Sequence, residues 1–314
     1  MHFSSSFRFL ISVLKYTLLL AVILIGINVY LDIYGLFRSV ESRKIPVYHA
    51  ERISKYLLTY KYVPHHFNTV ILGTSLSDNL DFSTANNNST GLKIYNASIM
   101  GANISELTPL AVNLLKHGVK RYVVCLSPYL TKNSGAKEVT LDKKLYYGAL
   151  GSKNLYETYA IGLIRHFNLL PGKFPKNQIG PSGVNDYGKL FAVGDVRKRI
   201  NKEVLENNDP IHIDSNALQS LQSLVALLRK NNAKVLFYFH PVPYDVFISR
   251  ESKFLDFQQI IRDVLGKENE LLEFNSREFK TFTQDDANYI DHAHLSKKGQ
   301  SFLADTLLSH MVSW

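Results

Sequence analysis

Residues 70–78 read VILGTSLSD, so an apolar run meets Gly73, Thr74 and Ser75 and the chain turns polar at once. The run from Asn68 to Leu72 has the apolar, β-branched pattern of a buried strand. Gly and Ser are common turn residues, and an isolated Gly-x-Ser is a weak catalytic signal. The segment therefore predicts a strand that ends in a tight turn, and alone it does not distinguish a nucleophilic serine from a turn hydroxyl.

Strand and helix patterns alternate from this segment onward. Further apolar strands are predicted at 119–126, 233–241 and 271–274, and helices at 105–117, 215–232, 256–265 and 297–311. Ser105 and Ser296 are the expected N-caps of the first and last of these helices. Helices that separate short apolar strands are typical of βαβ units, so the chain is predicted to form an α/β fold, with a parallel sheet covered by helices on both faces.

Polar residues follow each of the first three predicted strands. Ser75 follows the first, Ser127 the second and His240 the third. Active sites of parallel sheets lie at the carboxyl ends of the strands, so we expect these residues to be neighbours, with His240 lining a pocket. Residues 131–214 break the alternation with Gly, Asn, Lys and Tyr in irregular order, which predicts an insertion or lid over that edge.

The composition fits one large folded domain, or one domain with an insertion. The chain has 314 residues, of which 46% are hydrophobic, and a net charge of +9. A basic surface favours anionic partners such as phospholipid, nucleic acid or acidic glycan. The basic cluster at 196–202 is interpreted as a solvated helix face, and without a recognised motif nucleic acid is not an expected partner. Cys125, the single cysteine, lies in an apolar run and is expected to be a buried structural thiol.

The N-terminal segment predicts a membrane anchor. Phe9 to Leu31 is mostly apolar and as a helix would extend about 35 Å, enough to cross a bilayer. A buried core helix is one alternative, and a cleaved signal peptide is disfavoured because no small-x-small site follows. Basic residues on both sides leave the orientation open. The predicted organisation is a stub and anchor at 1–38, a connecting segment at 39–66, and an α/β domain at 67–314.

A second polar cluster lies just before the last predicted helix, in NYIDHAHLSKKG at 288–299. A serine hydroxyl needs a base to remove its proton, and the base needs an acceptor that fixes its tautomer. Asp291 and His294 are three residues apart, so in a helical turn the carboxylate could hold one ring nitrogen while the other faces outward. A simple polar turn is the alternative. A metal site that would also use His240 is less favoured, because the spacing lacks a zinc signature, and we expect no metal and no cofactor.

Together these motifs resemble the SGNH (GDSL-like) hydrolase superfamily. Gly-x-Ser after the first strand is similar to its first block, and Asp291-x-x-His294 before the final helix is similar to its last. Gly101 in YNASIMGANISEL matches the glycine of the second block. The N-x-S-x-x-G pattern at 96–101 and the N-terminal anchor are similar to membrane-anchored SGNH-like proteins of bacterial cell-envelope glycan systems. The resemblance covers Val70 to the C-terminus, apart from residues 131–214.

The resemblance implies a flavodoxin-like three-layer α/β/α fold and serine-based acyl chemistry. Ser75 would be the nucleophile, His294 the base and Asp291 its orienting acid, while the amides of Ser75 and Gly101 would form the oxyanion hole. The third block departs from the family pattern Gly-x-Asn-Asp, because the strand here ends in CLSPYLTKN. Asn103 and Asn133 are possible pocket residues, but neither is in register with the missing asparagine.

The expected function is an esterase or O-acyltransferase, with acetyl as the expected group, that acts on an envelope polysaccharide or similar carbohydrate. The resemblance implies a single-pass protein of the bacterial cytoplasmic membrane, with its domain on the extracytoplasmic side. Expected partners are the bilayer, through residues 9–31, an acylated or carbohydrate substrate, and envelope-assembly proteins. The alternative is a catalytically degenerate scaffold or glycan-binding component. An α/β-hydrolase is disfavoured, because Ser77 stands where its G-x-S-x-G elbow needs glycine.

Overall fold

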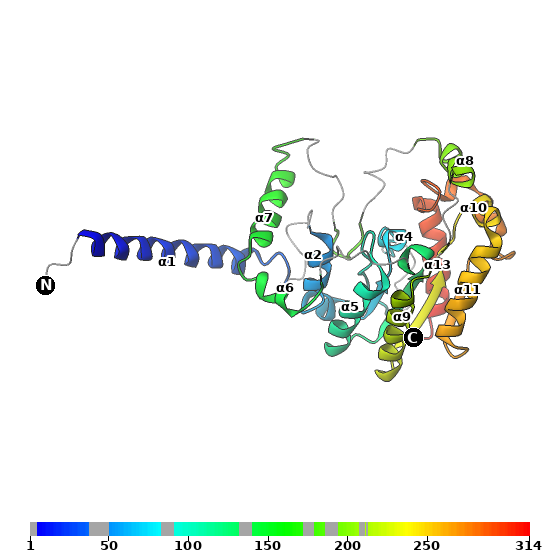
Figure 1. The fold of residues 1–314 in the computed structure, drawn as a ribbon, viewed down its shortest axis with the longest axis horizontal. Coiled ribbons are helices and arrows are strands. Elements are labelled where there is room, and N and C mark those ends of the chain that lie inside the picture. Colours follow the sequence, from blue (N-terminus) through cyan, green and yellow to red (C-terminus); the bar gives the residue numbers. More distant parts are fainter. Residues whose placement is uncertain are drawn as a thin grey trace.

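The protein forms an α/β fold around one parallel sheet (Figure 1). A computed structural model describes residues 5–37, 50–82, 91–131, 140–171, 179–185, 194–206, 211 and 213–314. Five strands lie in the order β2-β1-β3-β4-β5, and every neighbouring pair is parallel. Their bounds are β1 Thr69–Leu72, β2 Ile94–Asn96, β3 Arg121–Leu126, β4 Lys234–Phe239 and β5 Glu270–Glu273. This is the strand order of flavodoxin-like doubly wound sheets, so the predicted fold class is confirmed.

Helices cover both faces of the sheet and connect its strands. The α-helices are α1 Ser5–Leu31, α2 Glu51–Leu58, α3 Tyr62–His66, α4 Ser75–Asp78, α5 Ile104–Lys116, α6 Lys143–Gly148, α7 Lys153–His166, α8 Val196–Glu206, α9 Ser215–Lys230, α10 Tyr244–Ser249, α11 Glu251–Leu265, α12 Lys280–Gln284 and α13 Lys297–Met311. Two 3-10 turns, η2 Pro128–Thr131 and η4 Asp286–Asn288, lie after β3 and before α13.

The core has two parts because successive strand residues point to opposite faces of a sheet. Val70 and Leu72 of β1 belong to a cluster packed under α2, α5, α9 and α11. Ile71, between them, belongs to a second cluster with Cys125 and residues of α12 and α13. Two apolar layers, one on each side of the sheet, produce the three-layer α/β/α arrangement. Burial raises the pKa of Cys125 to about 12, as fits a structural thiol.

The helix starts follow from local capping chemistry. Ser296 is the N-cap of α13, as expected, and its side chain accepts from the amide of Gly299 at 3.3 Å. The expected cap of α5, Ser105, is wrong, because the helix begins earlier and Asn103 caps it. Asn103 forms a capping box with Glu106, which satisfies backbone donors at both positions.

The segment predicted at 39–66 to connect the anchor to the domain contains α2 and α3 in its described part. Tyr56, Leu57, Leu58 and Val63 of these helices are buried in the main core cluster. The helices are short, and their apolar positions are interrupted by Lys and His. The residues that do the packing are therefore hard to distinguish from a loop in the sequence.

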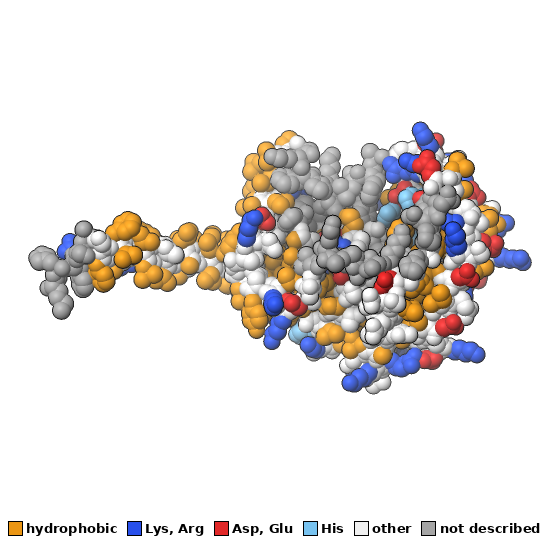
Figure 2. Space-filling model, in the orientation of Figure 1, with side chains coloured by type: hydrophobic (Ala, Val, Ile, Leu, Met, Phe, Trp, Pro, Cys, Tyr) orange, Lys and Arg blue, Asp and Glu red, His pale blue; other side chains and the backbone are white. Residues whose placement is uncertain are grey.

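Helix α1 extends away from the domain (Figure 1), and hydrophobic side chains cover it (Figure 2). Its span Ser6–Leu31 has 26 residues and is long and apolar enough to cross a membrane, with none of its most apolar window buried in the protein. The described chain therefore has the expected apolar N-terminal helix.

Candidate active site

Ser75 lies at the carboxyl end of β1, where it is the first residue of α4. Its Oγ is 3.1 Å from Nε2 of His294. The neighbouring hydroxyls are engaged elsewhere: the Thr74 side chain accepts from the amide of Leu76 at 3.3 Å, and buried Ser77 Oγ donates to Ser98 Oγ at 2.8 Å. Of the three hydroxyls in this turn, Ser75 is the one hydrogen-bonded to a histidine.

The other ring nitrogen of His294 lies against Asp291. The distance from His294 Nδ1 to Asp291 Oδ2 is 2.9 Å. A carboxylate can only accept, so Nδ1 carries the proton and Nε2 is free to accept the Ser75 hydroxyl proton. Asp291 Oδ1 also accepts the amides of Ala293 and His294, at 2.8 and 2.7 Å. Burial alone would raise the pKa of Asp291, but the hydrogen bonds and the nearby His294 outweigh it and hold this pKa far below its usual value.

A buried histidine fixes the turn that carries this pair. His240, at the end of β4, has Nε2 at 2.9 Å from the carbonyl oxygen of Ala293, so Nε2 carries the proton. Burial lowers the pKa of His240 to about 4, which keeps the ring neutral. Its own carbonyl accepts from Asn275 at 2.9 Å. His240 therefore acts on the Asp291–His294 turn through a backbone contact.

Gly73 allows the turn after β1 to pass close to β3. A Cβ at this position would lie 2.2 Å from Ser77 Oγ and 2.8 Å from Cys125 Cβ, well inside any normal contact. A side chain here would displace Ser77 or the strand, and with them the helical turn that begins at Ser75. The glycine is required for close approach.

The segment after β2 runs beside the Ser75 turn. The amide of Ile99 donates to the carbonyl of Gly73 at 3.0 Å, and Asn96 Nδ2 donates to the carbonyls of Ser77 and Leu80 at 2.6 and 3.1 Å. Gly101 follows on this segment with φ of 64°, a conformation that favours glycine. The loop that matches the family's second block is thus hydrogen-bonded to the turn that matches its first block.

Helix α2 holds the same loop with two basic side chains. Lys55 is fully buried, donates to the carbonyl of Ser98 and pairs with Glu51 at 3.2 Å. Arg52 donates to the carbonyl of Gly101 at 2.9 Å. These residues were missed from the sequence, where a lysine and an arginine in a mixed segment give no signal of burial.

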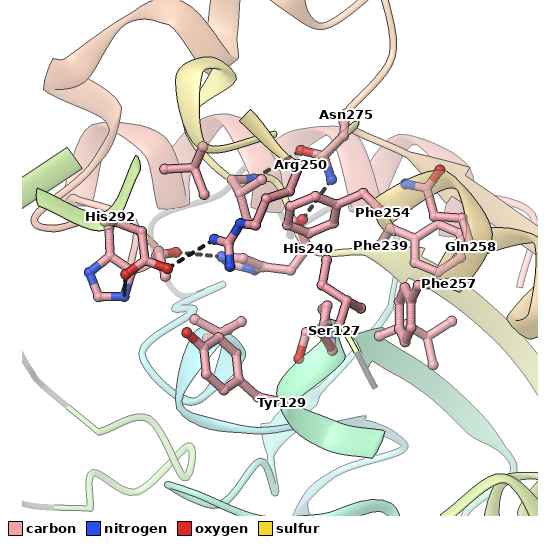
Figure 3. Close-up of a pocket in the computed structure, with 18 residues that line it drawn as sticks. Ser127, Tyr129, Phe239, His240, Arg250, Phe254, Phe257, Gln258, Asn275 and His292 are labelled. Carbon is pink, nitrogen blue, oxygen red and sulfur yellow. Dashed lines mark hydrogen bonds and ion pairs between the residues drawn. The ribbon is translucent and has the colours of Figure 1, made fainter. Parts of the chain in front are cut away.

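A pocket of about 50 Å³ lies at the carboxyl ends of β3 and β4 (Figure 3). Its lining includes Leu76 and Ala293, which are next in sequence to Ser75 and His294, and phenylalanine rings from β4 and α11. At its rim Glu203 of α8 accepts from Arg250 at 2.9 Å and lies 3.8 Å from His292. Glu203 belongs to the predicted insertion, so part of that insertion forms a wall of the pocket.

The remaining predicted residues divide between this pocket and elsewhere. His240 lines the pocket, and so does Ser127 from the end of β3. Ser127 Oγ and His240 Nδ1 are buried and have no hydrogen-bond partner within the described residues. Asn103 does not line this pocket and is engaged as the cap of α5. Asn133 lies outside the described residues.

The described ranges contain no cluster of three or more His, Cys, Asp or Glu side chains able to hold a metal ion. Asp291, His294 and His240 are close, but the described hydrogen bonds use the carboxylate and both rings. Within the described residues, the hydrogen-bonded group is the chain Asp291, His294, Ser75.

No protein-family model matches this chain, and no curated protein does so. Among solved structures, the chain is similar to a protein described as "a putative platelet activating factor from Streptococcus pneumonia". The TM-score is 0.46 and the sequence identity 12%, over 83% of this chain and 91% of that chain. A likeness at this level says nothing about activity.

Proposed function

We propose that this protein is a membrane-anchored serine esterase or O-acyltransferase of the SGNH type, which uses Ser75 to accept a short acyl group from a carbohydrate or similar ester. The observation that carries the proposal is the continuous hydrogen-bonded chain from Asp291 through His294 to Ser75 Oγ. A polar turn without a chemical role does not require the ring of His294 to meet the hydroxyl of Ser75, 219 positions away in the sequence.

The proposed reaction begins when Ser75 Oγ attacks the carbonyl carbon of the ester and its proton passes to Nε2 of His294. The Oγ–C bond forms while the carbonyl π bond opens to an oxyanion. Collapse of this intermediate breaks the bond to the leaving alcohol, and His294 returns the proton to that alkoxide. Asp291 stabilises the imidazolium formed in between. Water or a sugar hydroxyl then repeats the sequence on the acyl-enzyme, so hydrolysis and transfer share one site.

The oxyanion in this proposal is held by the backbone amides of Ser75 and Gly101. Each such donor is worth about 3 to 4 kcal/mol of transition-state stabilisation in related chemistry. The third donor of the family's oxyanion hole is the asparagine of its Gly-x-Asn-Asp block. This chain has Ser127-Pro128 at the corresponding strand end. We therefore expect slower turnover than a three-donor hole would support.

The pocket, whose lining includes Leu76 and Ala293, supports binding of a small, partly polar group. Its phenylalanine wall suits a methyl or short alkyl chain, while the buried Ser127 Oγ and His240 Nδ1 lack partners that a ligand hydroxyl could supply. Because His240 Nε2 donates to a carbonyl, its Nδ1 can only accept, and a hydroxyl is a suitable donor. An acetylated sugar combines both features, and an anchor on an envelope membrane would hold the site near such polymers.

The test is covalent labelling of the full-length protein in detergent with a fluorophosphonate probe. We expect Ser75→Ala and His294→Gln to abolish labelling and Ser223→Ala, an exposed hydroxyl on α9, to leave it unchanged. Release of acetate from acetylated oligosaccharides should follow the same pattern. Labelling that persists in Ser75→Ala would refute the assignment of the nucleophile, and a folded wild type without labelling would favour the non-catalytic scaffold.

A further inference from the structure

Exposed apolar side chains flank α7, one just before the helix and four at its C-terminal end, in the part of the chain predicted as an insertion, and we call them the apolar patch. We define it as Leu150, Leu163, Phe167, Leu169 and Leu170, whose exposed fractions are 39, 44, 64, 63 and 43%. Four of the five fall within eight residues of sequence. Exposed apolar side chains gathered this closely mark a surface that another apolar phase covers.

Helix α7 buries one side in the protein, and Leu163 of the patch lies on its exposed side. Leu155, Thr158, Tyr159 and Gly162 are its buried residues. The helix ends at His166, and just beyond it Asn168 has a left-handed φ of 50° and an amide that donates to the carbonyl of Arg165 at 3.1 Å. The two leucines that follow are therefore placed by a defined turn.

The same region is fixed to the end of α1. Asn28 is buried, and its side-chain amide donates to the carbonyls of Ala149 and Leu150 at 3.0 and 3.2 Å. Tyr159 of α7 donates to Asn28 Oδ1 at 2.8 Å. The position of α7 relative to α1 is thus set by hydrogen bonds among buried groups.

The length of α1 places this junction at a membrane surface. Residues 6–27 leave nearly every side chain exposed, and Asn28 is the first buried one. As a helix these residues extend about 33 Å, close to the thickness of about 30 Å of a bilayer's hydrocarbon core. Asn28, and the Leu150 carbonyl bonded to it, then lie at the level of the lipid headgroups.

The orientation of α7 is that of a helix lying at the level of the lipid headgroups. In Figure 1 α7 runs across the direction of α1 at the end of the domain where α1 leaves it. Figure 2 shows hydrophobic side chains along that same end of the domain. A helix that runs across a membrane-spanning helix at its exit point lies along the bilayer surface.

We propose that α7 and its apolar patch lie in the interface of the bilayer that α1 spans, so that the domain contacts lipid through a second element. The proposal rests on the membrane anchoring proposed above. Lys153, which is 86% exposed, and the basic residues Arg165 and His166 in the last turn suit anionic headgroups around an interfacial helix. This second contact would keep the domain from rotating freely about α1.

The experiment uses the full-length protein in lipid nanodiscs that hold one copy each. An environment-sensitive fluorophore is attached to Phe167→Cys, to Val22→Cys in α1, or to Leu255→Cys on α11, an equally apolar exposed site outside the patch. The native Cys125 is 1% exposed with its pKa raised to about 12, so it does not compete for the label. Quenching by nitroxide lipid is compared with quenching by iodide in water.

We expect the probe at 167 to be quenched by nitroxide lipid several-fold more than the probe at 255, and less by iodide. Equal quenching at 167 and 255, with strong lipid quenching at 22, would overturn the interfacial contact and leave the anchor standing. Weak lipid quenching at both 22 and 167 would overturn the anchor as well. The single copy in each disc excludes a second protein molecule as the cover of the patch.

Discussion

Replacing Asp291 by asparagine tests the proposed chemistry with a minimal change of shape. Asparagine keeps one oxygen, which can still accept the amides of Ala293 and His294 that Asp291 Oδ1 accepts at 2.8 and 2.7 Å. The turn should therefore form. The side-chain NH₂, however, faces Nδ1 of His294 at the position where a carboxylate oxygen accepts at 2.9 Å.

The magnitude follows from the tautomer. A donor opposite Nδ1 forces the His294 proton onto Nε2, which then donates across the 3.1 Å to Ser75 Oγ and can no longer accept the serine proton. The equivalent change in a serine triad lowers kcat about 10⁴-fold, or about 5 kcal/mol of transition-state stabilisation. We expect a loss of this order in Asp291→Asn.

The assay is hydrolysis of p-nitrophenyl acetate by the detergent-solubilised protein, with thermal unfolding measured on the same sample. Asp285→Asn is the control, because Asp285 caps η4 and pairs with Lys298 but lies outside the triad. If a folded Asp291→Asn protein keeps activity within tenfold of wild type while Ser75→Ala has none, His294 does not act as the base in the way proposed.

Acid unfolding provides a second readout of the same variant. The pKa of Asp291 is lowered in the folded state, so its ionisation stabilises the fold above the unfolded pKa of about 4. That stabilisation is lost progressively as pH falls below this value. Asp291→Asn should be less stable than wild type at pH 7, and the difference should shrink as the pH is lowered.

Three further variants test the residues that position the site. Lys55→Met should lower the free energy of unfolding by about 3 kcal/mol, because it removes the ion-pair partner of Glu51 and the donor to the Ser98 carbonyl. Lys153→Met removes an exposed ion pair and should cost less than about 0.5 kcal/mol in the same denaturation experiment. Gly73→Ala should lower the melting temperature and the esterase activity together. The control Gly151→Ala should change neither, because nothing lies within 4 Å of its new Cβ. A Gly73→Ala protein with native stability and activity would contradict the close contact. His240 has a pKa of about 4 in the folded protein and 6.5 in the unfolded chain, so protonation favours unfolding. The free energy of unfolding of the wild type should therefore fall by about 3 kcal/mol as the pH is lowered from 6.5 to 4. His240→Gln should flatten this part of a melting-temperature profile, and an unchanged slope would refute the buried neutral ring.

The sheet could be predicted from the sequence because its strands are short, apolar and separated by clear helices. The run at 68–72 and the structure's β1 at Thr69–Leu72 differ by one residue. β2, with only three residues, was not predicted, because IYN is too short to show a period. Helices α2 and α3 were missed since their burial comes from tertiary packing that no local pattern records.

The three hydrogen-bonded residues of the candidate site were easier to predict from the sequence than the residues that support them. Ser75, Asp291 and His294 belong to motifs with recognisable spacing, and the structure brings these three side chains into hydrogen-bond contact. Lys55 is a charged residue in a mixed helix, so its burial against the Ser98 carbonyl has no sequence signature. His240 follows β4, whereas Ala293 lies in the turn before α13. Their contact forms only in the folded protein, so a strand pattern alone does not predict it.

The order of the parts along the chain also has a consequence for biosynthesis. Ser75 follows the first strand, whereas His294 follows the last, and their hydrogen bond joins residues 219 positions apart. During synthesis the hydroxyl is made long before its base, and all five strands must assemble before the two meet. If Ser75 is the nucleophile as proposed, the nascent chain therefore carries it without its base until the C-terminal part has been made. In the proposed mechanism the site is complete only when the turn that carries His294 and the helix α13 after it have packed against the sheet, where Leu303, Leu307 and Met311 are buried.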